Sequence, residues 1–153
     1  MRDAVIVGAL RTAVGRKGGK LSGIRPDDLA ALVLKDLVAR LKVDPAEIED
    51  VILGCVDQLG EQGFNIARNA ALIAGLPVEV CGTTLDRMCG SGQQAANFAA
   101  MGVMAGQYDV VIAGGIEHMS PSGDGRARRS CLRTSPDDSW RISSARRLIV
   151  PMR

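Results

Sequence analysis

The sequence predicts an α/β domain whose central sheet is mostly parallel and carries helices on both faces. Three short runs are rich in Val, Ile and Ala, as strands buried on both sides require: AVIVGA at 4–9, VILGCV at 51–56 and DVVIA at 109–113. Between them lie longer segments whose apolar residues recur at helical spacing. Strands that alternate with helices in this way are typical of layered domains with a parallel sheet.

Composition supports a globular chain. Of the 153 residues, 46% are apolar and 24% are charged, so the chain can bury a core. The N-terminus lacks the apolar region and cleavage site of a secretory signal, and no run reaches the about 18 apolar residues of a membrane span. We therefore expect a soluble, cytoplasmic protein that does not bind membranes. No CxxC spacing occurs, which argues against a metal site or a disulfide framework for its four cysteines, Cys55, Cys81, Cys89 and Cys131.

The first elements have clear boundaries. The strand at 4–9 is expected to be buried and to lead into a glycine-rich basic loop. A helix then begins near Pro26, because proline suits the first turn and two aspartates follow it at the positive helix end, and apolar residues recur at helical spacing as far as Leu41. Asp44 is expected to cap the short helical turn that comes next.

The middle of the chain repeats this alternation. After the strand at 51–56, the segment NIARNAALIAGLP predicts a helix that stops at Gly75. A third, less apolar strand is expected at 83–86, followed by Cys89 and by a helix from 90 to 105. The small residues of this last helix would let it lie deep between other elements, as a central helix.

Cys89 is the strongest candidate for a chemical role. Ligands of parallel sheets bind at the carboxyl ends of the strands, and Cys89 follows such an end. At a helix N-terminus, unpaired backbone N–H groups and the helix dipole favour thiolate over thiol. Such a thiolate can be the nucleophile of acyl transfer, with the backbone N–H groups as donors to the oxyanion. Cys55 and Cys81 are expected to be buried structural residues.

Several other features have weaker interpretations. GSGQQA at 90–95 matches a dinucleotide fingerprint, but Asp109 begins its strand and Glu117 lies too far along to hold a ribose. His118 is the only histidine and is expected to make structural hydrogen bonds rather than to act as a base. A basic loop is expected to be solvated rather than to bind phosphate; it contains Arg16, Lys17 and Lys20.

The composition changes near Ser120. Residues 1–119 hold 11 Lys/Arg against 14 Asp/Glu, net −3, whereas residues 120–153 hold 8 Arg, no Lys and 3 Asp, net +5. We divide the chain there into a domain, 1–119, and an Arg/Ser/Pro-rich tail, 120–153, with at most a short helix or strand near its end. Such a tail is typical of out-of-frame translation of a GC-rich gene. It has little aromatic content, so we expect a solvated segment and no nucleic-acid partner.

The segment LDRMCGSGQQAANFAAMGVMAGQYDVVIAGGIEHMS resembles the active-site signature of thiolases, the acetyl-CoA acetyltransferases and 3-ketoacyl-CoA thiolases. RTAVG, VILGCV and NIARNAALIAGLP resemble the N-terminal half of that family in order and spacing. The resemblance covers Met1 to about Ser120. It implies the N-terminal half-domain of a thiolase-like layered fold, and a place in fatty acid metabolism and β-oxidation.

The resemblance also implies a reaction. In the family, the cysteine that matches Cys89 attacks an acyl-CoA, releases CoA and becomes an acyl-thioester intermediate. The acyl group then passes to CoA in the degradative direction, or to an acetyl-CoA carbanion in the synthetic one. No metal or cofactor is needed, because the CoA thioesters are themselves the substrates. A homo-oligomer, dimer or tetramer, is implied, with the strand before Cys89 near the subunit contact.

The sequence departs from the family after Ser120. Family members are more than twice as long, and their second half supplies two histidines and a second cysteine to the reaction. No segment here resembles those motifs, and His118 matches none of them. A CoA-binding insertion and a later strand that completes the sheet are also missing. We therefore expect a truncated thiolase that is inactive alone. The alternative is a non-catalytic relic, or a dimerisation fragment that pairs with a full-length thiolase.

Overall fold

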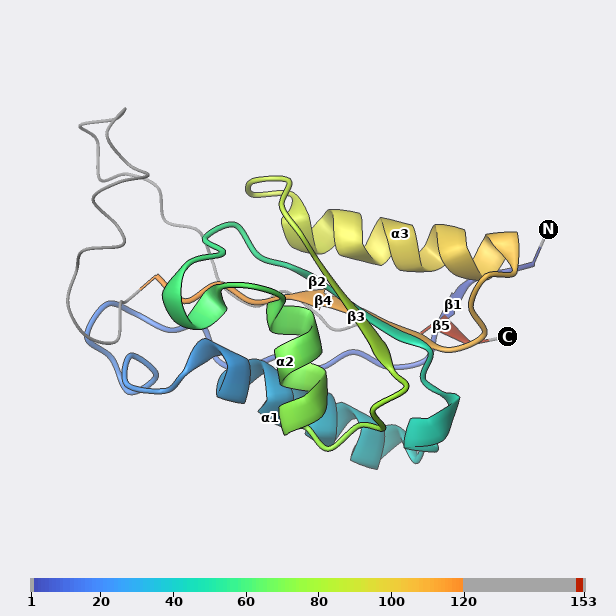
Figure 1. Ribbon diagram of the computed structural model, residues 1–153, viewed down its shortest axis with the longest axis horizontal. Helices are drawn as coiled ribbons and strands as arrows, with labels where there is room; N and C mark the ends of the chain where they lie inside the picture. Colours follow the sequence, from blue (N-terminus) through green and yellow to red (C-terminus); the bar gives the residue numbers. More distant parts are fainter. Residues whose placement is uncertain (1, 120–150, 153) are drawn as a thin grey trace.

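A computed structural model, which describes residues 2–119 and 151–152, has three layers (Figure 1). A parallel three-stranded sheet with the order β3-β2-β4 forms the middle layer. Helix α3 covers one face of this sheet, and helices α1 and α2 lie on the other (Figure 1). This arrangement confirms the predicted α/β class.

The central strand contributes to the cores on both sides of the sheet. The strands are β2 (Asp50–Gly54), β3 (Cys81–Leu85) and β4 (Val111–Gly115), and their ends lie within two residues of the predicted ones. All of β2 is buried. Successive side chains of a strand point to opposite faces. Val51 and Leu53 therefore join the core under α1 and α2, while Ile52 joins the core under α3.

The helices follow the predicted start and stop signals. Helix α1 (Pro26–Leu41) begins at the predicted proline and includes the apolar residues predicted for it. Helix α2 (Ile66–Ile73) ends just before Gly75, whose φ of +83° suits glycine. Two 3₁₀ turns, η1 (Pro45–Glu47) and η2 (Gly60–Gln62), connect the layers. The predicted cap is confirmed, because Oδ1 of Asp44 accepts the backbone N–H of Ala46 at 3.0 Å.

Helix α3 (Ser91–Ala105) packs its small residues onto β2 and β4. The approach is closest at Gly54, the last residue of β2. A Cβ at this position would lie 2.3 Å from the carbonyl carbon of Ser91 and 2.4 Å from the nitrogen of Gly92. Only a glycine lets the first turn of α3 rest directly on the end of the central strand. The helix N-terminus is thereby fixed at the carboxyl edge of the sheet.

The predicted buried strand at 4–9 is wrong. Strand β1 contains only Val5–Ile6, both exposed, and it lies outside the three-stranded sheet. It pairs antiparallel with β5 (Pro151–Met152). An apolar run is buried only where strands on both sides and covering helices meet it, and β1 has a two-residue strand on one side only. The predicted tail otherwise lies outside the described residues, and the boundary at 119 stays a prediction.

No helix in the described part of the chain is both long and apolar enough to cross a membrane.

Candidate active site

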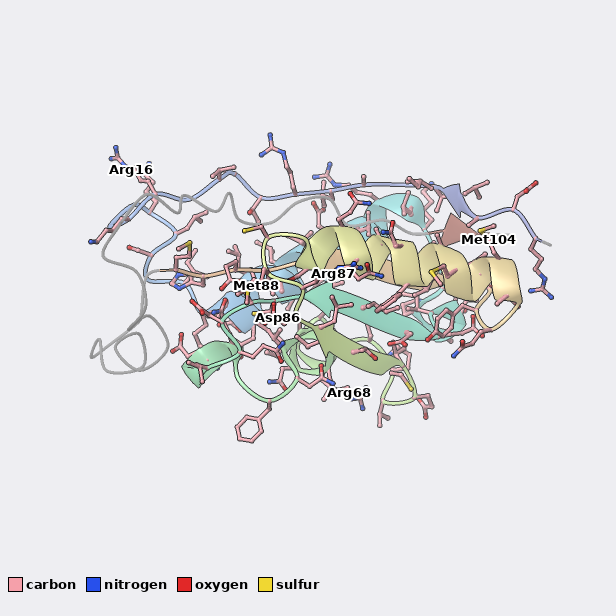
Figure 2. All side chains as sticks on the ribbon, turned by 90° about the horizontal axis from the view of Figure 1, so that it is seen from above. Arg16, Arg68, Asp86, Arg87, Met88 and Met104 are labelled. Carbon is pink, nitrogen blue, oxygen red and sulfur yellow. The ribbon has the colours of Figure 1, made fainter. Side chains whose placement is uncertain are left out.

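Cys89 lies in the turn that joins β3 to α3, and it is exposed. Figure 2 shows the residues just before it, Asp86, Arg87 and Met88, beside the first turn of α3. Because β3 ends at Leu85, this turn stands at the carboxyl edge of the parallel sheet. The predicted position of the cysteine, between a strand and a helix, is confirmed.

The turn reverses the chain sharply. Met88 has a φ of +48°, in the left-handed region that residues other than glycine seldom adopt. The N–H of Gly90 donates to the Arg87 carbonyl at 3.0 Å, and that of Ser91 donates to the Met88 carbonyl at 3.0 Å. The Asp86 carboxylate accepts the Met88 N–H at 2.7 Å. These bonds hold Cys89 at the outer side of a tight turn.

Ser91 braces this turn from the inside. The residue is only 4% exposed. Its Oγ accepts the Arg87 N–H at 2.8 Å and donates to the Met88 carbonyl at 2.6 Å. In the sequence, Ser91 stands out only as part of GSGQQA, and its role in the turn was not predicted. A serine three positions after the turn residue is a known pattern for such a side-chain bond to the backbone, and that spacing was a usable signal.

The N-terminus of α3 follows Cys89 directly and has no side-chain cap. Its N-cap residue is Gly90, which has no side chain to bond the N–H groups of the first turn, and that turn contains no acidic residue. The first N–H groups of a helix have no partner within the helix, and the dipole adds positive potential there. Negative charge that develops beside Cys89 would therefore be stabilised.

The other cysteines differ from Cys89. Cys55 is 1% exposed, and burial, with the nearby Glu117 and Asp57 carboxylates, raises the pKa of its thiol to about 12. The expected structural role of Cys55 agrees with this burial. Cys81, in contrast, is exposed, so its predicted burial is wrong. It begins β3, an edge strand of the described sheet that has another strand on one side only. Cys131 lies outside the described residues.

The carboxyl end of β4 carries a second polar group. Glu117 accepts the N–H of Val56 at 2.8 Å and that of Asp57 at 3.2 Å, which ties β4 to the loop after β2. Burial raises the pKa of the Glu117 carboxyl above 4.5, although these two bonds oppose the rise. His118 donates its backbone N–H to Oε1 of Gln62 at 2.6 Å.

His118 makes a side-chain contact, and the basic loop is exposed. The His118 ring Nε2 lies 3.3 Å from the Leu21 carbonyl oxygen, which confirms the expected structural hydrogen bonding. The basic side chains of the loop are exposed: Arg16, Lys17 and Lys20. Within residues 2–119 and 151–152, no three His, Cys, Asp or Glu side chains gather as metal ligands.

The chain is thus an α/β domain with an exposed cysteine in a turn between a strand and a helix, at the carboxyl edge of a parallel sheet. A family model described as "Thiolase, N-terminal domain" matches residues 4–140, and the chain belongs to this family. The matched region extends past the predicted boundary at 119.

Individual relatives agree with the family match. The chain is 52% identical over 120 residues to a steroid 3-ketoacyl-CoA thiolase of Mycobacterium tuberculosis, covering 78% of this chain and 30% of the relative. It is 54% identical over 121 residues to a beta-ketoadipyl-CoA thiolase of Escherichia coli, with the same coverage of 78% and 30%. A 3-ketoacyl-CoA thiolase of Vibrio vulnificus is 50% identical over 121 residues, with coverage of 78% and 31%. The chain thus spans about 30% of the length of the curated relatives it matches.

Proposed function

We propose that this chain carries the nucleophile of a thiolase-type acyl transfer and that Cys89 is that nucleophile. The observation that carries the proposal is the exposed Cys89 beside the uncapped N-terminus of α3, in a chain of the thiolase family. The names of the relatives support 3-ketoacyl-CoA and other CoA thioesters as substrates, and fatty acid metabolism as the setting. The cytoplasm is the proposed compartment.

The proposed step is acylation of the cysteine. The Cys89 thiolate forms a bond to the carbonyl carbon of an acyl-CoA, and the electron pair of the C=O bond moves to oxygen. Backbone N–H groups at the start of α3 stabilise this oxyanion. The pair then returns, the bond between carbon and the CoA sulfur breaks, and CoA takes up the proton that Cys89 lost. The product is an acyl-thioester on Cys89 and free CoA.

Transfer of the acyl group onward needs an acid or base. His118 is the one histidine in the sequence, and its ring nitrogen Nε2 lies 3.3 Å from the Leu21 carbonyl oxygen. For this chain we therefore propose acylation alone, without metal or cofactor, and expect little complete turnover. General acid–base catalysis contributes about 100-fold to 10,000-fold in rate, so its loss would be large.

Intact mass spectrometry after incubation with acetyl-CoA tests this proposal. We expect the parent chain to gain the mass of one acetyl group and Cys89→Ala to gain none. Cys81→Ala is the matched control, because Cys81 is the other exposed cysteine among the described residues. Equal labelling of Cys89→Ala and the parent, or no label on a folded parent, would contradict the proposal.

A second proposal is assembly with a thiolase subunit, as an oligomer of this chain or with a longer relative. The outer face of α3 supports it, because apolar side chains are exposed there: Phe98 46%, Met101 60% and Met104 39%. So does β3, an edge strand of the described sheet whose Cys81 and Thr83 are exposed. Sedimentation velocity should show a defined dimer or tetramer, or a mixed oligomer when a full-length thiolase is added. A monodisperse monomer in both experiments would refute it.

A further inference from the structure

We propose that Ser91 is the positioning residue of the acylation site, because its hydroxyl holds the turn that presents Cys89. The inference rests on the proposed function, since it concerns how the cysteine meets a thioester. Ser91 itself is not expected to touch the substrate, because it is 4% exposed and its hydroxyl points back into the turn.

The bonds of Ser91 fall on the two residues that set the turn. Its Oγ accepts the Arg87 N–H at 2.8 Å and donates to the Met88 carbonyl at 2.6 Å. Oδ1 of Asp86, which accepts the Met88 N–H, lies 3.5 Å from the same Oγ. One buried hydroxyl thus connects three consecutive residues directly before Cys89 to the first residue of α3.

The conformation at Met88 explains why such support is needed. A left-handed φ of +48° is unfavourable for methionine, and the side chain is 69% exposed, so packing contributes little to holding it. Strained backbone persists where the surroundings over-determine it. At Met88 those surroundings are the bonds to Asp86 and Ser91, and Figure 2 shows Asp86 and Met88 close together at the mouth of α3.

The backbone of Ser91 is itself held in place. It packs against Gly54 at the end of β2, where no side chain would fit. Ser91 therefore connects the end of β2, through its backbone, to the turn, through its hydroxyl. Without the hydroxyl, the turn would keep the backbone bonds from Gly90 and Ser91 but would lose the bond that holds the Arg87 N–H. The Cys89 sulfur would then be less well placed for the oxygen of its acyl group to accept hydrogen bonds from the helix N–H groups.

The experiment compares Ser91→Ala with the matched variant Ser22→Ala. Ser22 makes the same kind of bond, from its Oγ to the carbonyl three residues earlier, at 2.6 Å, but in the basic loop. Two rates are measured: acetylation of Cys89 by acetyl-CoA, and hydrogen exchange of the Arg87 amide by NMR. Ser91→Ala should slow acetylation about tenfold, as expected for a misplaced reacting group. It should speed exchange at Arg87 about fivefold, as expected for one lost hydrogen bond.

Several controls separate positioning from a general loss of structure. In Ser91→Ala, hydrogen exchange of the β4 amides should match that of the parent. Alkylation of Cys89 by iodoacetamide should change less than twofold, because this reaction needs no oriented carbonyl group. Ser91→Thr keeps the hydroxyl and should restore both rates. If Ser91→Ala loses protection in β4, the comparison is repeated with Ser91→Cys, which keeps a weaker hydrogen-bonding group.

The possible outcomes are distinct. Unchanged Arg87 exchange in Ser91→Ala would overturn the inference, as would equal acetylation of that variant and the parent. A folded parent that acetyl-CoA does not label would refute the proposed function instead, and the exchange result would still decide whether Ser91 holds the turn.

Discussion

Replacing Gly54 with alanine should damage both the stability of the domain and the reactivity of Cys89. A Cβ at this position would lie 2.3 Å from the Ser91 carbonyl carbon, 2.4 Å from the Gly92 nitrogen and 2.6 Å from the Ser91 oxygen. All three are backbone atoms, so no side chain can rotate away. To reach an ordinary contact of 3.4 Å, the start of α3 must move by about 1 Å.

The magnitude follows from that displacement. Overpacking of a filled interior costs about 1–3 kcal/mol, and the Gly54→Ala variant should lie in the upper part of this range because backbone must shift. A reacting group misplaced by about 1 Å can lose about 100-fold in rate. Urea denaturation gives the free energy of unfolding, and mass spectrometry gives the acetylation rate. Gly23→Ala is the control, because a Cβ there meets nothing within 4 Å. Stability and acetylation equal to those of the control would refute the packing argument.

Three further predictions concern the raised pKa values of Cys55 and Glu117 and the helix cap at Asp44. Cys55 should resist iodoacetamide at pH 8 in the native state while Cys81 reacts, because burial raises the pKa of Cys55 to about 12; peptide mass spectrometry checks this. Because burial raises the pKa of Glu117 above its usual value, the native state keeps a proton that the unfolded state releases, so the free energy of unfolding should fall as pH rises from the usual carboxyl pKa through the raised one. Glu117→Gln should flatten that slope in urea titrations, and the exposed Glu79→Gln should not. Asp44→Ala should lower the free energy of unfolding by about 1 kcal/mol, through loss of the cap on Ala46, and an unchanged urea midpoint would contradict it.

Elements with local physical signals were predictable from sequence. Pro26, Gly75 and the cap at Asp44 each act through their own backbone or side chain, and the structure has all three where expected. The position of Cys89 was predictable for the same reason, since a strand pattern precedes it and a helix pattern follows. These signals need no knowledge of distant parts of the chain.

Features that depend on distant neighbours were not predictable. Val5 and Ile6 are as apolar as the residues of β2, but only sheet partners and covering helices decide burial, and β1 has only the two-residue β5 beside it. Cys81 is exposed because β3 lies at an edge of the described sheet, which the strand pattern does not reveal. The turn before Cys89 is a different case, because it is local: the spacing of Ser91 to Met88 was a usable signal, whereas the left-handed φ of Met88 was not, since methionine seldom adopts it.

The strand order β3-β2-β4 has a consequence for how the chain folds. The central strand is made before either of its neighbours, and its ladder to β4 joins residues 61 positions apart, Asp50 to Val111. Contacts between residues so far apart in sequence slow folding, because a long loop must close before they form. During synthesis, β2 therefore leaves the ribosome before either partner, and one of its two edges stays unpaired until β4 has been translated. Refolding should be slow and sensitive to chain concentration, since unpaired strand edges also associate between chains.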